Sequence, residues 1–405
     1  MPQAQQQLTP ADVNEIARRA LRSVSQRMKQ QIFSQNGLQN QNQITVKANN
    51  VGLITGYWVN VVLTITNGSA VQINRTDFGP ANALSNIQMN DMQNVQRINV
   101  PGWYMHFLNS AKMGRAFGSA MVRTTGFDSP IAYDAQAINQ ISAPATIAPA
   151  GTGTVNMWYY VPCAYSRDDL RGCIYGNVVN ATMQLTLALP GSNGVSVAVQ
   201  NGLDSTLAMY IGNVAGAVAL ATITAATVTV FQEYFDNLPT LAMYGLPSPG
   251  PGALLLPVTD LATVYELKQT VQSGPVVNQD FPYQFSNFRD FLSVFAVYVN
   301  TAATGARQNG QDVNRWKLLS ANLTPVFDIP PGLIFLESRN RCGVDFPPGC
   351  YYFDFRERPI ATTQYGNTQL VLNPATVGAG AYQLIGTEDF ALLSTLSTAG
   401  SLAAS

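Results

Sequence analysis

Apolar residues along much of this chain recur at every second position, which is the spacing of a strand with one buried face. The clearest alternation predicts a strand over residues 57–66, with apolar positions at Tyr57, Val59, Val61, Leu63 and Ile65. Similar patterns predict strands over residues 155–161, 182–189, 222–235, 293–299, 332–337, 351–355 and 368–372. Turns rich in Gly, Pro and Asn separate these segments, without regular helices between them. The pattern therefore predicts an all-β fold of antiparallel sandwiches.

One long helix is predicted near the N-terminus, over residues 9–33. Thr9 is a suitable cap, Pro10 suits the first turn, and Asp12 stabilises the positive end of the helix dipole. At about 100° per residue, the apolar positions fall on one side of this helix and most basic positions on the other. The apolar positions are Val13, Ile16, Ala17, Ala20, Leu21, Val24, Met28 and Ile32.

Positive charge is concentrated in this helix. The first 30 residues hold two acidic residues and five basic ones, which are Arg18, Arg19, Arg22, Arg27 and Lys29. A basic amphipathic helix can lie on an anionic lipid surface, where Arg27 would extend to the edge of the apolar face. The same pattern also fits a helix packed on its own domain or on a neighbouring copy, and these residues alone favour packing.

A run rich in proline, over residues 237–252, offers the best division of the chain, because these prolines cannot occupy a central strand. A chain of 405 residues also exceeds the usual size of a single core. The residues after 384 lose periodicity and are expected to form an arm. The predicted parts are an N-terminal helix with a Gln- and Asn-rich linker (1–43), a first sandwich (44–240), a second sandwich (241–384) and a C-terminal arm (385–405).

Charge is unusually sparse. Charged residues make up 11% of the chain, against about 25% in a typical soluble domain, and the net charge is −1. A neutral surface does not attract polyanions over long range, which argues against a protein that coats DNA or RNA. It does tolerate close packing of many copies of one chain.

The N-terminal residues lack the basic and apolar regions of a secretory signal, so we expect synthesis in the cytoplasm. The uncharged stretch 205–232 contains Asn, Gly and many Thr residues, and is expected to be a loop entering a strand and not a membrane span. The spacing of the four cysteines fits neither a zinc site nor a disulfide framework, so reduced thiols are expected. The cysteines are Cys163, Cys173, Cys342 and Cys350.

Catalytic motifs are missing from the sequence: it has no GxSxG, P-loop or HExxH motif. The single histidine, His106, lies in an aromatic and apolar string and is expected to be structural. Two pairs of adjacent carboxylates, Asp168 with Asp169 and Glu388 with Asp389, invite a glycosidase interpretation, but adjacency does not place two carboxyls across a cleft. We expect these four side chains to be solvated in turns, and we expect no cofactor and no metal.

Several ordered blocks of sequence carry a family resemblance. They are TDFGPAN (76–82), GWYMHFLNSAK (102–112), MWYYVP (157–162), DFPPGCYY (345–352) and NPATV (373–377). In this order and spacing, the chain resembles the major capsid proteins of tectiviruses, which are icosahedral phages with an internal membrane. The blocks extend over residues 76–377, and the resemblance assigns no role to the cysteines, of which only Cys350 lies within a block. The segments 190–222 and 300–343 do not match and are expected to be loops that form outward towers.

The resemblance implies a double jelly roll, with two eight-stranded antiparallel sandwiches in one chain. It implies a non-enzymatic capsid protein of the virion, whose homotrimers are pseudo-hexagonal and tile a shell around a lipid membrane and a double-stranded DNA genome. Neighbouring capsomers and the minor capsid, vertex and membrane proteins would be its partners, without sequence-specific contact to nucleic acid. The N-terminal helix would lie near the membrane, which places Arg18, Arg19, Arg22, Arg27 and Lys29 at the inner surface or on the membrane.

Two other functions fit parts of the sequence. A carbohydrate-binding or glycoside-cleaving sandwich would use an exposed aromatic residue such as Trp103 or Trp158 as a platform for the sugar. A membrane-surface protein would depend on residues 9–33 alone.

Overall fold

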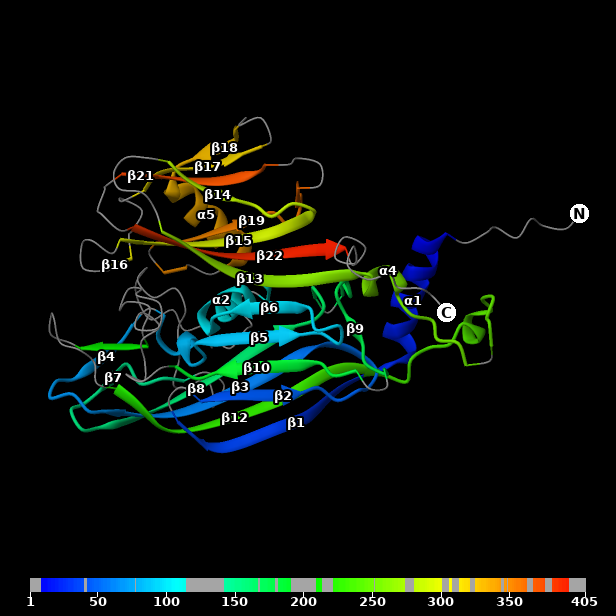
Figure 1. The fold of residues 1–405 in the computed structure, drawn as a ribbon, viewed down its shortest axis with the longest axis horizontal. Helices are drawn as coiled ribbons and strands as arrows, with labels where there is room; N and C mark the ends of the chain where they lie inside the picture. Colours follow the sequence, from blue (N-terminus) through cyan, green and yellow to red (C-terminus); the bar gives the residue numbers. More distant parts are fainter. Residues whose placement is uncertain are drawn as a thin grey trace, which may run out of the picture.

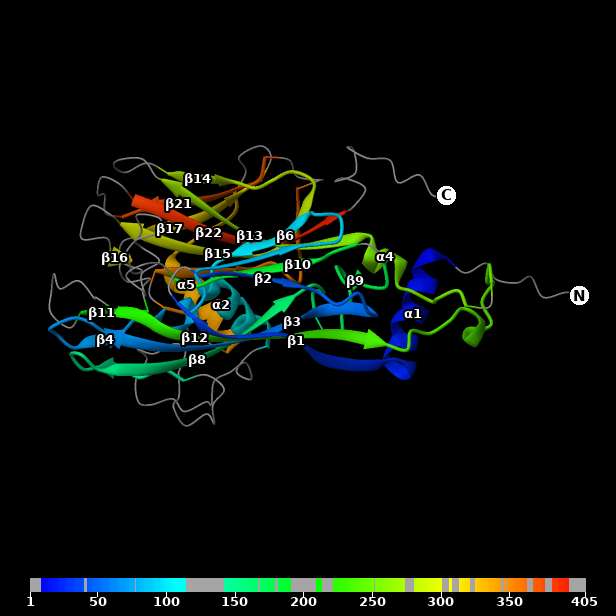
Figure 2. The same cartoon turned by 60° about the horizontal axis from the view of Figure 1, so that its bottom comes forward.

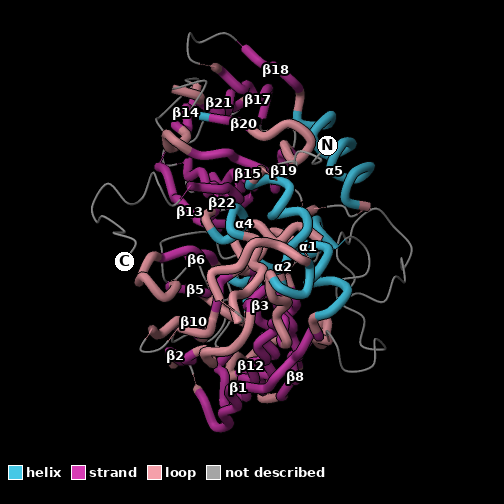
Figure 3. The backbone as a smooth tube through the Cα atoms, turned by 90° about the vertical axis from the view of Figure 1, so that its right-hand side faces the viewer, coloured by secondary structure: helices cyan, strands magenta, loops and turns pink. Residues whose placement is uncertain are grey.

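The computed structural model describes residues 9–39, 42–76, 78–113, 142–166, 168–178, 181–190, 209–212, 221–250, 252–273, 280–300, 306–307, 313–320, 325–343, 346–347, 349–362, 367–375 and 381–392. These residues form two β-sandwiches whose strands run along the long axis of the molecule (Figure 1). Viewed along that axis, one sandwich lies above the other (Figure 3).

The first sandwich packs a five-stranded sheet on four strands of a larger sheet. In β3, odd-numbered residues from Tyr57 to Ile65 are buried and the even-numbered residues between them are half-buried, which confirms the predicted alternation. The five-stranded sheet contains β1 (Gln26–Leu38), β12 (Ala221–Asp236), β3 (Leu53–Asn67), β8 (Thr152–Pro162) and β9 (Ile174–Tyr175). The facing strands are β6 (Gln96–Val100), β5 (Asn86–Asn90), β10 (Gln184–Ala188) and β2 (Gln43–Lys47). A small sheet joins β11 (Tyr210–Gly212), β4 (Ile73–Arg75) and β7 (Thr146–Ile147).

The second sandwich has a core of its own, in which Trp316 packs on Tyr351 and Phe353. One sheet contains β13 (Thr263–Ser273), β22 (Ala381–Leu392), β15 (Arg289–Asn300) and β16 (Ala306–Arg307), and β19 (Cys350–Asp354) and β20 (Ile360–Ala361) pair with β15. The facing sheet contains β14 (Phe281–Gln284), β21 (Gln369–Pro374), β17 (Val313–Leu319) and β18 (Pro325–Ile329).

A parallel pairing of β6 with β13 joins the two sandwiches, with Ile98 opposite Leu267. The two inner sheets thereby become one ten-stranded sheet. Helix α2 (Gly102–Met113) packs at this junction, where the Tyr104 ring lies against Gly386 of β22. A Cβ atom at position 386 would come within 2.4 Å of that ring, so only glycine fits. The halves are therefore in tight contact.

The other helices lie mostly near the ends of the strands. They are α1 (Pro10–Val24), α4 (Val258–Leu261) and α5 (Pro331–Cys342), with the 3-10 helices η1 (Gly79–Asn82) and η4 (Ala242–Tyr244). Two views place α1 and α4 at one end of the long axis, while β4, β11 and β16 lie toward the opposite end (Figures 1 and 2). The two ends of the molecule are therefore built from different elements.

The helix predicted over residues 9–33 is too long. It ends at Val24, and the extended backbone of Ser25, with ψ 147°, leads into β1. Strand β1 pairs with β12 from Gln26 to Leu38, so the Gln- and Asn-rich linker expected before residue 44 is shorter as well. The hydrogen bonds of this ladder outweigh a weak local preference for helix. Consequently, Arg27 and Lys29 lie on a strand.

Residues 332–337 belong to α5, and the strand predicted there is wrong. The buried positions Ile334, Ser338 and Cys342 recur every four residues, which is a helical spacing. A short apolar run does not distinguish a strand from a buried helix. Together with β17 and β18, this helix also corrects the expectation that 300–343 is loop throughout. Much of 190–222 lies outside the described residues.

Residues 385–392 are not an arm, because they form most of β22. This strand lies between β13 and β15 in the middle of its sheet, and every residue from Gln383 to Ala391 is buried. A strand buried on both faces has no alternation of polar and apolar residues, so its sequence lacks the two-residue period that predicts the other strands. Residues 393–405 of the predicted arm lie outside the described residues.

Candidate functional site

The N-terminal helix α1 packs on its own chain. The Thr9 hydroxyl accepts a hydrogen bond from the Asp12 backbone N–H at 3.2 Å, and the Asp12 carboxylate caps Thr9 in return. The apolar face of α1 is covered: Ala17 and Ala20 pack on Leu255, and Leu21 packs in a second cluster. Most of this face is therefore occupied, and of its apolar residues only Val24, at the end of α1, is exposed.

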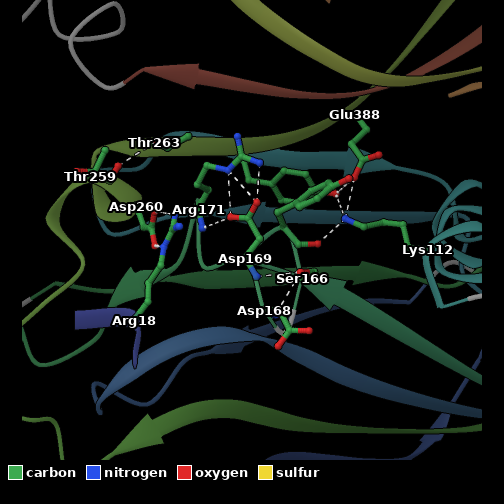
Figure 4. A network of polar contacts seen from close by, with 12 residues as sticks. Arg18, Lys112, Ser166, Asp168, Asp169, Arg171, Thr259, Asp260, Thr263 and Glu388 are labelled. Carbon is green, nitrogen blue, oxygen red and sulfur yellow. Dashed lines mark hydrogen bonds and ion pairs between the residues drawn. The ribbon is translucent and has the colours of Figure 1, made fainter. Parts of the chain in front are cut away.

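Arg18 attaches α1 to the start of the second half of the chain. Its Nε donates to Asp260 Oδ2 at 2.7 Å, and the Asp260 side chain is fully buried in α4 (Figure 4). Asn14 supports the same contact, because its Nδ2 donates to Asp260 Oδ1 at 3.3 Å and its Oδ1 accepts from the Thr259 N–H. The hydrogen bond to Asp260 raises the pKa of Arg18. Arg18 is therefore a structural anchor.

Arg19 and Arg22 are the predicted residues that project from the polar face of α1. Arg19 is 77% exposed and its Nε lies 3.0 Å from Glu15 Oε1, one helical turn away. Arg22 donates to the Asp168 carbonyl at 2.6 Å and lies 3.9 Å from the Asp168 carboxylate. Asp168 is exposed, as expected for a turn. Both pairs are exposed to water, so they contribute little to stability.

Arg27 and Lys29 share one buried carboxylate. Arg27 Nε lies 2.9 Å from Glu233 Oε1, and Lys29 Nζ lies 3.8 Å from Glu233 Oε2. Glu233 also accepts a hydrogen bond from the Trp58 indole at 2.7 Å. The Arg27 guanidinium lies over the Phe235 ring, at 5.1 Å from the ring centroid. These contacts hold β1 on β12.

The five predicted basic residues do not form a free positive patch. Each has an acidic partner in the same chain, and the acids come from segments far apart in sequence. The partners are Asp260 for Arg18, Glu15 for Arg19, Asp168 for Arg22, and Glu233 for both Arg27 and Lys29. The basic residues can be recognised in the sequence from their local density, but Asp260 and Glu233 cannot, because these are single acids in other elements.

A buried ion pair crosses the junction of the two sandwiches. Lys112 Nζ, on α2, lies 2.8 Å from Glu388 Oε1 on β22, and the Tyr265 hydroxyl donates to the same oxygen at 2.6 Å (Figure 4). Ser293 Oγ donates to Glu388 Oε2 at 2.8 Å. Burial lowers the pKa of Lys112 against the opposing effect of Glu388. The elements of this site come from both halves.

A second buried cluster lies beside the first. Asp389 Oδ2 accepts from Arg289 Nη1 at 2.7 Å, and the same guanidinium contacts Glu266. Burial raises the pKa of Asp389 to about 6. The expectation that Glu388 and Asp389 are solvated in a turn is wrong, because both lie in the interior of β22. The fact that Glu388 and Asp389 are adjacent in sequence does not indicate that a sheet buries both of them.

The contacts continue from the junction to α1. Arg97 Nε donates to Asp91 Oδ2 at 2.8 Å, and Arg97 Nη1 donates to the Gly172 carbonyl at 2.8 Å. The Gly172 N–H donates to the Asp260 carbonyl at 3.0 Å, and the φ of +89° at Gly172 requires glycine. Asp260 is therefore held from both sides, by Gly172 through its backbone and by Arg18 through its side chain.

Other candidate residues are structural. His106 is fully buried in α2, and burial lowers its pKa to about 4. Trp103 is 1% exposed, so it is not a platform for a sugar. Trp158, on β8, is half-buried and stacks on Phe231. The side chains of all four cysteines are buried. Within the described ranges, no group of three His, Cys, Asp or Glu side chains is placed to hold a metal ion.

No helix among the described residues is long and apolar enough to cross a membrane.

Comparison with known proteins gives consistent matches over both halves. Residues 7–238 match the model of the P3 major capsid protein N-terminal domain, and residues 262–404 match that of the C-terminal domain. The curated relative "Major capsid protein P3" of Enterobacteria phage PRD1, a tectivirus, is 38% identical over 354 residues. That alignment covers 87% of this chain and 84% of the relative.

Solved capsid structures share the fold. The major capsid protein of Sulfolobus turreted icosahedral virus superposes with a TM-score of 0.61 at 10% identity, covering 93% of this chain and 100% of that one. A chain of the PBCV-1 virus capsid superposes with a TM-score of 0.52 at 11% identity, covering 90% and 93%. These neighbours are double jelly rolls, which confirms the expected fold class.

Proposed function

The chain belongs to the P3 major capsid protein family, and from this premise we propose that three copies associate into one pseudo-hexagonal capsomer. Membership of this family makes the chain a structural protein of a phage virion and not an enzyme. The trimer, its orientation in the shell and its partners are proposals that family membership alone does not establish.

The observation that carries the proposal is the junction of the two sandwiches. The β6–β13 pairing places them side by side, with their strands along one axis (Figure 3). Three copies arranged around an axis parallel to the strands would bring together six similar sandwiches. Six similar corners give a nearly hexagonal outline, and hexagonal units can tile a closed icosahedral shell. The geometry of one chain thus supports the capsomer.

Low charge supports association through packing. With 11% charged residues, much of the surface is neutral, so little charge has to be desolvated when copies meet. A permanent interface between copies buries more than about 2,000 Å² and resembles a core cut in half. The trimer would therefore depend on shape and apolar contact more than on ion pairs.

The two ends of the molecule support an orientation in the shell. We place the end with α1 inward, toward a lipid membrane that encloses double-stranded DNA, and the opposite end outward. In this arrangement Arg18, Arg27 and Lys29 fix the N-terminal segment, while Arg19 and Arg22 face the inner surface. Minor capsid, vertex and membrane proteins would bind at the edges of capsomers, after synthesis of the chain in the cytoplasm of a bacterial host.

Electron microscopy of the purified chain tests this function. Negatively stained particles should show threefold symmetry and six lobes around a centre. Particles with only two lobes, at every concentration that can be imaged, would contradict the capsomer.

A further inference from the structure

The end of the molecule that carries α1 has a loop without charged residues. No Lys, Arg, His, Asp or Glu occurs between Asp236 and Asp260, and we call residues 237–259 the uncharged loop. Two views show its green ribbon extending past α1 along the long axis (Figures 1 and 2). Among the described residues, the part of the chain that reaches furthest at this end is therefore neutral.

The base of the uncharged loop is held firmly. The Leu241 N–H donates to the Ala253 carbonyl at 2.9 Å, and the Leu255 N–H donates to the Pro239 carbonyl at 2.7 Å. Leu241 and Leu246 pack with Leu255 in the apolar cluster of α1. The loop and α1 are thus one packed unit.

The tip of the uncharged loop exposes apolar side chains. Helix η4 carries Met243, which is 66% exposed, and Tyr244, which is 38% exposed. The Tyr244 hydroxyl lies 3.4 Å from Ser23 Oγ, so the aromatic ring stands beside the end of α1. Val24, the last residue of α1, is also exposed. An apolar body with a polar tip, as in tyrosine, suits the boundary between lipid and water.

The size and chemistry of this tip favour a bilayer over a protein. A stable protein interface needs about 800 Å² on each partner, which a few side chains on a narrow loop do not provide. A bilayer accepts single apolar side chains, each with weak affinity, and copies on one capsomer would add their contributions. Anionic headgroups are not required, because the loop has no charge and each of the five basic residues already has an acidic partner.

We propose that the uncharged loop, through Met243 and Tyr244, contacts the lipid bilayer directly and independently of lipid charge. The inference rests on the proposed function, which turns this end toward a membrane. In this arrangement, α1 supports the uncharged loop and does not insert its own apolar face into the bilayer.

Vesicle flotation with the full-length chain tests the proposal. The chain should float with vesicles of pure phosphatidylcholine, and the bound fraction should be the same in 0.5 M NaCl as at low salt, at about 0.05 M. The double variant Met243→Ser/Tyr244→Ser should lower the bound fraction about fivefold or more, because it removes the exposed apolar tip. Val326→Ser is the matched control: it removes a side chain that is 63% exposed on β18, and it should float like the unmodified chain.

A second pair of variants separates the loop from the helix. Arg19→Gln/Arg22→Gln should float like the unmodified chain. Binding that requires anionic phosphatidylglycerol, and that disappears in salt or in this arginine variant, would overturn the proposal in favour of α1. Unchanged flotation of Met243→Ser/Tyr244→Ser would overturn it as well.

The native mass distinguishes failure of this inference from failure of the proposed function. Met243→Ser/Tyr244→Ser should keep the trimer mass and its melting temperature, because both side chains are exposed. A fall to the monomer mass would instead identify the loop as a contact between copies and would overturn its role in lipid binding. A monomeric unmodified chain would contradict the proposed function while leaving the flotation result valid.

Discussion

Lys112 and Glu388 form a buried ion pair although 276 residues separate them, with Lys112 Nζ 2.8 Å from Glu388 Oε1. One residue belongs to the first half of the chain and the other to the second. Tyr265 and Ser293 donate further hydrogen bonds to the carboxylate. The Glu388 side chain is fully buried and that of Lys112 is 13% exposed, so the carboxylate depends on these partners instead of on water. Two charges so placed restrict how the halves can dock.

Lys112→Met should destabilise the chain by about 3–5 kcal/mol, because it leaves the Glu388 carboxylate buried without its cation. The double variant Lys112→Met/Glu388→Gln should recover most of that loss, since a neutral amide needs no cation and keeps partners in Tyr265 and Ser293. Urea unfolding of the two variants and of Glu388→Gln gives the coupling energy. Losses that simply add would show that the pair is not coupled.

Two buried groups should give opposite dependences of stability on pH. Burial raises the pKa of Asp389 from 3.8 to about 6 and lowers that of His106 from 6.5 to about 4. Between pH 4 and 6, the folded chain holds a proton on Asp389 that the unfolded chain releases, so this group makes stability fall as pH rises. His106 binds a proton only in the unfolded chain, so it makes stability rise. We expect the two slopes to cancel.

Single variants should reveal each slope. From pH 4 to pH 6, the unfolding free energy of Asp389→Asn should rise by about 3 kcal/mol relative to that of the unmodified chain, because the opposing contribution of Asp389 is removed. His106→Gln should change the pH dependence by about the same amount in the opposite direction, because the contribution of His106 is removed. Urea unfolding at three pH values measures both slopes, independently of the absolute stability of each variant. Equal slopes in the two variants would contradict this assignment.

Arg18 and Arg19 are adjacent in α1 but lie in different environments, so substituting each of them gives a controlled comparison. Arg18→Met should cost about 2 kcal/mol, because Asp260 is fully buried and loses its cation. Arg19→Met should change stability by less than about 0.5 kcal/mol, because its pair with Glu15 is exposed. Hydrogen exchange should show lost protection in α1 for the first variant only. Equal exchange in both would refute the anchoring role of Arg18.

The strands with one solvated face could be predicted from sequence, since β3 and β8 alternate as a two-residue period requires. Strand β22 could not, because both of its faces are buried and it carries Glu388 and Asp389 inside. The boundary between α1 and β1 was missed for a related reason: pairing with β12, not local preference, decides the conformation after Val24.

For each ion pair of the candidate site, only one of the two partners could be predicted from the sequence. Clustered basic residues are visible in a sequence, whereas Asp260 and Glu233 are isolated acids whose partners lie far away along the chain. The same holds for Lys112 and Glu388. Family resemblance supplied the double jelly roll and the capsid role, but not the use of Arg18 and Arg27 as internal anchors.

The proposed trimer should persist in salt. Because association would depend on apolar packing, raising NaCl from about 0.1 M to about 1 M should leave the sedimentation coefficient unchanged, although it screens exposed ion pairs. Dissociation at a few tenths molar would show that exposed charge pairs hold the copies together.

The native mass of the purified chain in reducing buffer, measured by light scattering coupled to size exclusion, tests the capsomer most directly. One chain has a mass of 43.6 kDa, so three times 43.6 kDa, about 131 kDa, is expected for the trimer. A stable species at that mass is the predicted result. A species that stays at 43.6 kDa at all concentrations would contradict the assembly of three copies into one capsomer.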